Sequence, residues 1–304
     1  MAASRGRIAL ITVGLTIGIV ALFLGTVWIL MTVMDEGSLP GGSKVAIVEV
    51  DGIIGIGQDR SADSDAIVRT LGEYRDNPSV AAVVLRINSP GGVVGPTQEI
   101  FSAVERVRAG GKPVVASLGA VAASGGYYIA VAANRIFASP GSLTGSIGVV
   151  MQVANVEGLL RKVGVDYVVI KAGAYKDIGS FARPMKPAER QVLQALLDDV
   201  YAQFVTAVAE HRSLDRKAVL AFADGRIYSG QQARALKMVD DLGGLEEAVQ
   251  AAAKLAGISG KPRVIYPRRR FSLRDLISNR LGLGGATGLL PALPSLRTPL
   301  YLMM

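Results

Sequence analysis

The sequence contains no cysteine and only one histidine, His211. Without cysteine the chain can form no disulfide, no thiolate metal site and no cysteine nucleophile. A single histidine excludes an HExxH zinc site, and any Ser-His-Asp triad would have to use His211. That residue stands between Glu210 and Arg212, a charged setting that favours a solvated surface position over a catalytic one.

Positive charge is concentrated at the two ends of the chain. The formal net charge is +8, yet residues 35–260 carry −1, whereas residues 261–304 carry +7. A nucleic-acid enzyme is expected to present a basic face on its folded domain. The near-neutral body therefore argues against nucleic acid as a partner. Because half of all residues are hydrophobic, the body can bury a substantial core.

Residues 8–34 contain no charged side chain and are rich in Leu, Ile, Val and Gly. About 20 apolar residues span a bilayer, whereas the apolar part of a cleaved signal peptide is roughly 7–15 residues long. We therefore predict an uncleaved transmembrane helix. Two arginines precede it and two acidic residues follow it, so the positive-inside rule places residues 1–7 in the cytoplasm and the body outside it. Residues 35–43 are predicted to be a linker.

Apolar runs typical of strands alternate with amphipathic segments through residues 44–260. The nearly continuous apolar run at residues 80–87 is typical of a strand buried on both faces. This order predicts an α/β fold with a parallel sheet and short crossover helices. The predicted strands are 44–50, 53–56, 80–87, 113–117, 135–138, 147–153 and 167–170, and the predicted helices are 64–75, 97–108, 124–133, 188–211 and 244–256.

The basic tail, residues 261–304, departs from this pattern. Three consecutive arginines precede an amphipathic segment at residues 271–283, and a Gly- and Pro-rich stretch follows. The tail is either a disordered basic extension or a segment that binds anionic lipid or a neighbouring subunit.

Two glycine-containing turns are candidates for chemistry. The sequence NSPGG, which ends in Gly91 and Gly92, follows a predicted buried strand. Ligands bind at this end of the strands in open α/β sheets, and paired glycines can turn backbone N–H groups toward an anionic atom. The turn is therefore a candidate oxyanion hole, although a simple strand-ending turn explains the same residues.

Ser124 is the candidate nucleophile. It opens a predicted helix and is followed by two glycines, so its hydroxyl is accessible and lies in the positive field of the helix N-terminus. The more common role for serine at this position is an N-cap. Ala122 stands where the GxSxG elbow requires glycine. No lysine has a serine three residues before it, which excludes the Ser-x-x-Lys arrangement.

A nucleophilic serine needs a base, and Lys176 is a candidate. It lies among small residues after a predicted strand, and burial can lower the pKa of a lysine to about 7–8. A surface lysine paired with Asp177 is the alternative. Spacing alone does not select between the two.

Four motifs taken together resemble signal peptide peptidase A, also called protease IV, in its short single-domain form. The resemblance covers roughly residues 44–256. The motifs are RINSPGG at 86–92, ASGGYYIA at 123–130, TGSIGV at 144–149 and AGAYKDIGS at 172–180.

The resemblance implies a Clp/crotonase-like fold of repeated ββα units and a Ser-Lys dyad that uses no metal or other cofactor. It places the nucleophile at Ser124, the general base at Lys176, and at Ser146 the hydroxyl that orients the lysine. The oxyanion hole that it implies is formed by the backbone amides around Gly91, Gly92 and Gly125.

The function that the resemblance implies is a membrane-anchored serine endopeptidase that degrades cleaved signal peptides and other apolar peptides. The long bacterial form is a tandem duplication that places serine and lysine in different halves. Here both lie in one predicted domain, so each copy either supplies its own pair or shares it across a homo-oligomer contact.

Three other interpretations stay open: a catalytically idle membrane scaffold, an acyl-CoA enzyme of the crotonase type, and a stomatin-linked membrane peptidase. The intact Ser124, Ser146 and Lys176 argue against the scaffold. An extracytoplasmic position would deny a crotonase-type enzyme its CoA. The stomatin-linked group usually carries further membrane spans, and no second run of about 18 apolar residues appears in the sequence.

Overall fold

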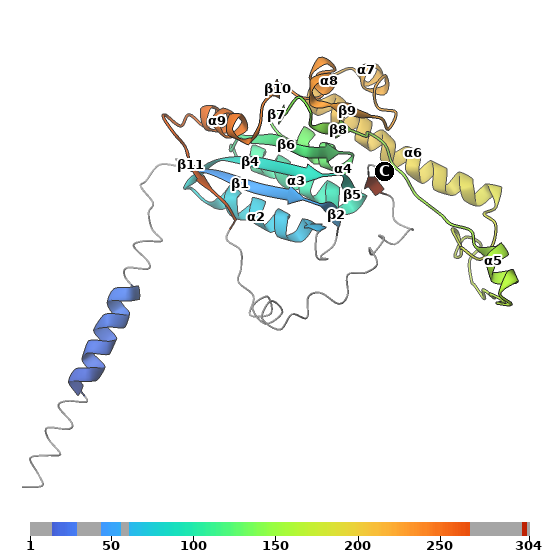
Figure 1. The fold of residues 1–304 in the computed structure, drawn as a ribbon, viewed down its shortest axis with the longest axis horizontal. Helices are drawn as coiled ribbons and strands as arrows, with labels where there is room; N and C mark the ends of the chain where they lie inside the picture. Colours follow the sequence, from blue (N-terminus) through green and yellow to red (C-terminus); the bar gives the residue numbers. More distant parts are fainter. Residues whose placement is uncertain (1–13, 29–43, 56–60, 268–299, 303–304) are drawn as a thin grey trace, which may run out of the picture. The chain divides into compact units, whose positions relative to one another are not determined.

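The computed structural model describes residues 14–28, 44–55, 61–267 and 300–302 (Figure 1). The chain divides into two units, residues 1–42 and 43–304. In the first unit, Gly14–Trp28 is an apolar helix whose side chains are mostly exposed. The rest of the predicted span, the predicted cytoplasmic N-terminus and the linker lie outside the described residues, as does most of the basic tail.

The second unit is built on a mainly parallel sheet, which within the described residues has eight strands. Its central strands run in the order β7-β6-β4-β1, and each pair is parallel. The prediction of an α/β fold with a parallel sheet is confirmed. The strands are β1 (Lys44–Asp51), β4 (Val80–Ser89), β6 (Val114–Ala123), β7 (Arg135–Ala138), β8 (Leu143–Gly145), β9 (Ile227–Ser229), β10 (Asp241–Leu242) and β11 (Arg263–Ile265).

A smaller sheet lies beyond the carboxyl end of β4. It runs in the order β12-β5-β2-β3, and Ile54 of β2 pairs in parallel with Gly92 of β5. On the other edge of β5, β12 runs antiparallel, with Tyr301 opposite Gly92. The bounds of its strands are β2 (Ile53–Gly55), β3 (Ser61–Asp63), β5 (Gly91–Val93) and β12 (Leu300–Leu302).

Helices cover both faces of the large sheet (Figure 1). Alternate side chains of β1 point to opposite faces: Ala46 and Val48 belong to the larger core, whereas Val45 and Ile47 pack with α9. The helices are α2 (Ser64–Asp76), α3 (Val94–Ala109), α4 (Gly125–Val131), α5 (Glu157–Lys162), α6 (Pro187–Arg212), α7 (Arg216–Leu220), α8 (Gly230–Ala235) and α9 (Leu245–Leu255).

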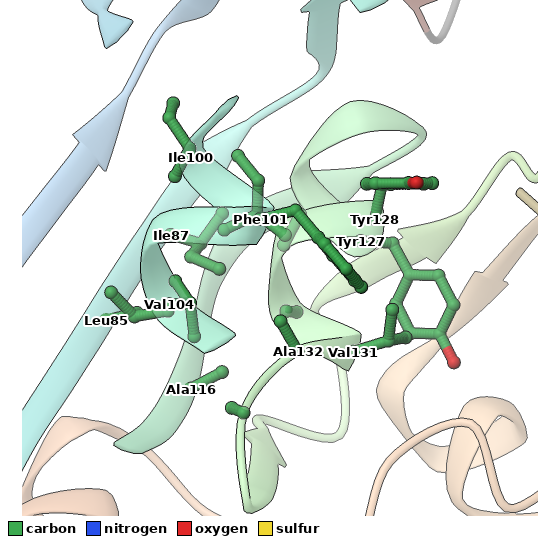
Figure 2. Close-up of a cluster of buried hydrophobic side chains, with 14 of the residues drawn as sticks. Leu85, Ile87, Ile100, Phe101, Val104, Ala116, Tyr127, Tyr128, Val131 and Ala132 are labelled. Atoms are coloured by element: carbon green, nitrogen blue, oxygen red, sulfur yellow. The ribbon is translucent and has the colours of Figure 1, made fainter. Parts of the chain in front are cut away.

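The larger core joins β4 to α3 and α4. Figure 2 shows Ile87 of β4 beside Phe101 of α3, with Tyr127 of α4 in the same cluster of buried side chains. Tyr127 is fully buried, and its hydroxyl donates to the carbonyl of Met238 at 2.9 Å. The packing and this hydrogen bond fix α4, and therefore fix the turn from which α4 begins.

Among the described residues, α6 is the one helix long and apolar enough to cross a membrane by length and composition; the helix Gly14–Trp28 is shorter. The C-terminal half of α6 packs into the larger core. Phe204 and Val205 are fully buried in the larger core, and the ring of Phe204 contacts the ring of Tyr128 on α4 at 5.0 Å.

The predicted strands at residues 147–153 and 167–170 are wrong. Residue 150 forms an isolated bridge, and residues 165–171 have no regular structure. Both runs are apolar enough for strands, but a strand also needs a neighbouring strand whose backbone pairs with it. Residues 151–186 leave the sheets and carry α5, so Val168 and Ile170 remain 80 % and 97 % exposed.

Candidate functional site

Ser124 occupies a strained turn between β6 and α4. Its φ and ψ angles are 52° and −117°, a conformation that costs a residue other than glycine about 1–3 kcal/mol. Two backbone hydrogen bonds hold it there: the Ser124 N–H donates to the carbonyl of Gly145 at 2.7 Å, and the Ser124 carbonyl accepts from Tyr128 N–H at 2.8 Å. A strained turn from strand to helix is also where the nucleophilic serine of α/β-hydrolases lies.

The hydroxyl of Ser124 is buried without a partner. The residue is 1 % exposed, so the prediction of an accessible hydroxyl is wrong for the single chain, and its Oγ makes no hydrogen bond within the described part of the chain. It does not cap α4, which rules out the N-cap interpretation of this serine. A buried hydroxyl without a hydrogen bond is costly, and such groups are rare outside functional sites.

The Gly91-Gly92 turn packs directly on this serine turn. A Cβ atom on Gly125 would lie 3.2 Å from the Cα of Gly91 and 3.3 Å from the nitrogen of Gly92, so a larger residue would have to push this turn away by a few tenths of an ångström. Gly91 has φ of 106°, and its N–H donates to Ser89 Oγ at 3.1 Å. Gly125 opens α4, where the first N–H groups of a helix lack intrahelical partners. The structure thus brings the predicted glycines to Ser124.

Ser146 lies at the same end of the sheet. The preceding strand, β8, pairs with β6 so that Gly145 stands opposite Ala123. Ser146 is 7 % exposed and has φ of 50°, and its N–H donates to the carbonyl of Arg226 at 2.8 Å. Both predicted serines therefore occupy buried positions in left-handed backbone at adjoining strand ends.

Lys176 is not brought to Ser124 within one chain. Lys176 is exposed, in a series of turns in which its N–H donates to the carbonyl of Gly173 at 3.2 Å. Figure 1 shows α5, which belongs to the same segment outside the sheets, residues 151–186, lying well away from the strands. In the described residues, no hydrogen bond or ion pair holds the ammonium of Lys176.

The alternative pairing of Lys176 with Asp177 is contradicted. The carboxylate of Asp177 binds Lys171 Nζ through Oδ1 and Arg183 Nε through Oδ2, the latter at 2.8 Å. Hydrogen bonds from Arg183 and Lys171 hold the pKa of Asp177 well below its usual range. Sequence reasoning missed Arg183, because nothing in the sequence says which of several nearby charges will meet.

His211, on α6, packs against α3, so the prediction of a solvated surface position is wrong. Its Nε2 lies 3.3 Å from Glu105 Oε1, and its ring meets the ring of Phe101 edge-on at a centroid distance of 5.1 Å. Burial lowers its pKa. Neighbours in sequence stand on different sides of a helix, so the charges at 210 and 212 do not decide where His211 points.

Across the described ranges, no group of three or more His, Asp or Glu side chains is placed to hold a metal ion.

The sequence matches a peptidase family and resembles known proteins whose names describe proteases or peptidases. The model of "Peptidase family S49" matches residues 106–259, which include Ser124, Ser146 and Lys176. The Synechocystis sp. protein named "Putative protease slr0021" is 47 % identical over 71 % of this chain and 75 % of its own length. "Protease 4" of Salmonella typhi is 37 % identical over 71 % of this chain and 35 % of its own length. The Enterococcus faecium protein named "Putative signal peptide peptidase SppA" is 33 % identical over 78 % of this chain and 70 % of its own length.

Proposed function

Because the chain belongs to peptidase family S49, we propose that it is a serine endopeptidase that works through a dyad of Ser124 and Lys176. The observation that carries this proposal is the buried hydroxyl of Ser124, which has no hydrogen-bond partner among the described residues and projects from a strained turn against a glycine pair. Strain and an unsatisfied hydroxyl both cost stability, so a catalytic role explains why they occur together.

The proposed reaction is peptide-bond hydrolysis through an acyl-enzyme. Neutral Lys176 accepts the proton of Ser124 Oγ as that oxygen attacks the scissile carbonyl carbon. The N–H groups of Gly92 and Gly125 stabilise the resulting oxyanion, with Gly91 shaping the turn. Lysine then returns the proton to the leaving amine, and water hydrolyses the ester. Ser146 orients the lysine. No cofactor takes part.

We place the dyad between two copies of the chain in a homo-oligomer. Ser124 is buried in the body, whereas Lys176 is exposed on a segment that also leaves Val168 and Ile170 in water. Covering these apolar side chains with a second copy would bury area that a single copy leaves exposed. It would also exclude water from the lysine, which needs a low-dielectric site to become neutral.

The proposed substrates are cleaved signal peptides and other apolar peptides, bound as extended strands. The edge of β5 already receives such a strand, because β12 runs antiparallel along it. Main-chain pairing to a strand edge is a common mode of peptide recognition. The description of the Enterococcus relative as a signal peptide peptidase supports this substrate class.

We further propose a single-pass membrane anchor at residues 8–34, of which Gly14–Trp28 is the described helix. The N-terminus would be cytoplasmic and the peptidase domain, residues 44–260, extracytoplasmic. The parallel sheet supports a Clp/crotonase-like arrangement of ββα units for this domain. The basic tail, residues 261–304, would contact anionic lipid or a neighbouring subunit.

Hydrolysis of a fluorogenic apolar peptide by the full chain in detergent micelles tests the proposal. Ser124→Ala and Lys176→Met should each reduce kcat to background, while Ser142→Ala, a buried serine that donates to the carbonyl of Gly119, should retain activity. The native rate should rise through a single ionisation between about pH 6 and about pH 10. Activity of Ser124→Ala equal to the native chain would refute the proposal, and an inert native chain would favour the scaffold.

A further inference from the structure

We propose that Arg183 is a positioning residue for Lys176. By binding the carboxylate of Asp177, Arg183 and Lys171 together keep that carboxylate from pairing with the ammonium of its neighbour in sequence. The inference deepens the proposed function, because it assumes that Lys176 is the base.

Arg183 is bound on both sides by carboxylates. Its Nε donates to Asp177 Oδ2 at 2.8 Å, and Nη1 and Nη2 donate to the two oxygens of Glu189 at 2.8 and 2.5 Å. Nη2 also donates to the backbone carbonyl of Asp177 at 3.2 Å. Lys171 occupies the other oxygen of Asp177. The planar guanidinium therefore fixes both the side chain and the main chain of the residue next to Lys176.

Glu189 fixes Arg183 in turn. It lies in the first turn of α6, is only 2 % exposed, and accepts the N–H of Lys186 at 2.9 Å. The hydrogen bonds from Arg183, followed by that from the Lys186 amide, lower the pKa of Glu189 to about 2. A buried carboxylate that loses its partner is strongly destabilising. Arg183 is therefore held in its ion pair with Glu189, and its Nε remains hydrogen-bonded to Asp177.

This arrangement bears on the charge state of Lys176. A carboxylate within about 4–6 Å favours the charged form of a lysine and raises its pKa by roughly 1–3 units. Asp177 is the carboxylate next to Lys176 in sequence, and two cations occupy both of its oxygens. On the neighbouring helix, Glu157 of α5 pairs with Arg161. Among the described residues, both of these carboxylates are therefore bound by cations other than Lys176.

Competitive acetylation of the full chain in detergent micelles, read by mass spectrometry at Lys176 across pH, measures this effect without needing activity. Arg183→Met frees one oxygen of Asp177, so the labelling midpoint of Lys176 should rise by about 1 unit or more. The double variant Arg183→Met/Asp177→Asn should return the midpoint to the native value or below. Arg75→Met, which breaks the ion pair with Asp76 at the end of α2, is the matched control and should leave the midpoint unchanged.

Two further variants distinguish the proposed effect from a loss of folding. Arg183→Lys retains a cation for Asp177 and should restore most of the native midpoint, and Lys171→Met should raise it less than Arg183→Met does. The midpoint of the pH–rate profile should move with the labelling midpoint. An unchanged midpoint in folded Arg183→Met and Lys171→Met would overturn the inference, as would a double variant that stays shifted. Failure of the dyad itself would appear separately, as hydrolysis that survives Ser124→Ala.

Discussion

Gly92→Ala is the substitution whose effect the structure defines most sharply. A Cβ atom at this position would lie 1.9 Å from the carbonyl oxygen and 2.5 Å from the nitrogen of Ile54. Both are backbone atoms of β2, so no side chain can turn away to make room. Real Cβ atoms essentially never come within 3.0 Å of another atom, and β5 must therefore move away from β2 by about 1 Å.

That movement should reduce activity more than stability. Overpacking in a well-packed region costs about 1–3 kcal/mol. Loss of one oxyanion donor lowers kcat by about 10²–10³, and a displacement of about 1 Å can by itself cost about 10². We therefore expect kcat for peptide hydrolysis to fall by about 10² or more in a protein that still folds.

Gly95→Ala is the matched control, because a Cβ atom there would meet nothing within 4 Å. It lies three residues further on, in α3, and alanine is favourable in a helix. Urea unfolding would report the stability of both variants, and steady-state kinetics would report kcat and KM. A Gly92→Ala variant with native kcat and KM would refute both the strand packing and the proposed oxyanion donor.

Three further predictions concern separate features of the site. Ser146→Ala should lower kcat roughly tenfold with little change in KM, because it removes one hydrogen bond to the lysine; equal changes in both constants would contradict that role. Tyr301→Pro removes a backbone N–H from β12 and so weakens its pairing with β5. If β12 competes with the substrate for the edge of β5, KM for an extended peptide should fall, as measured by steady-state kinetics. His211→Gln should retain hydrolysis within about twofold. Burial lowers the pKa of His211, so the stability that this residue contributes is complete above about pH 6.5 and is lost as the pH falls below that value. The free energy of unfolding of His211→Gln, measured in urea, should therefore vary less with pH in this window.

Short-range patterns predicted much of this fold. The apolar run at residues 80–87 corresponds to β4 (Val80–Ser89), and the predicted helix 188–211 corresponds to α6 (Pro187–Arg212) within one residue at each end. The serine turn was also visible, since small residues after an apolar strand mark a tight approach. These features depend on residues close together in the chain, so local sequence contains the necessary information.

Features that depend on distant partners could not be predicted in this way. Residues 167–170 have the composition of a strand, but no described strand pairs with them. The ring of His211 contacts Phe101 and Arg108 of α3, which lies about a hundred residues earlier in the chain. Asp177 meets Arg183 instead of its neighbour Lys176. In each case the outcome is decided by which segments come together in space.

Complementation between two inactive variants tests the central claim most directly. Differently tagged Ser124→Ala and Lys176→Met chains would be co-expressed, purified through both tags as mixed oligomers and assayed for peptide hydrolysis. If the dyad forms between copies, a contact that joins the intact serine of one chain to the intact lysine of another is active, and roughly a quarter of randomly mixed contacts should be of this kind. Recovery of hydrolysis toward that level is the predicted result; mixed oligomers as inactive as either variant alone would contradict a dyad shared between copies.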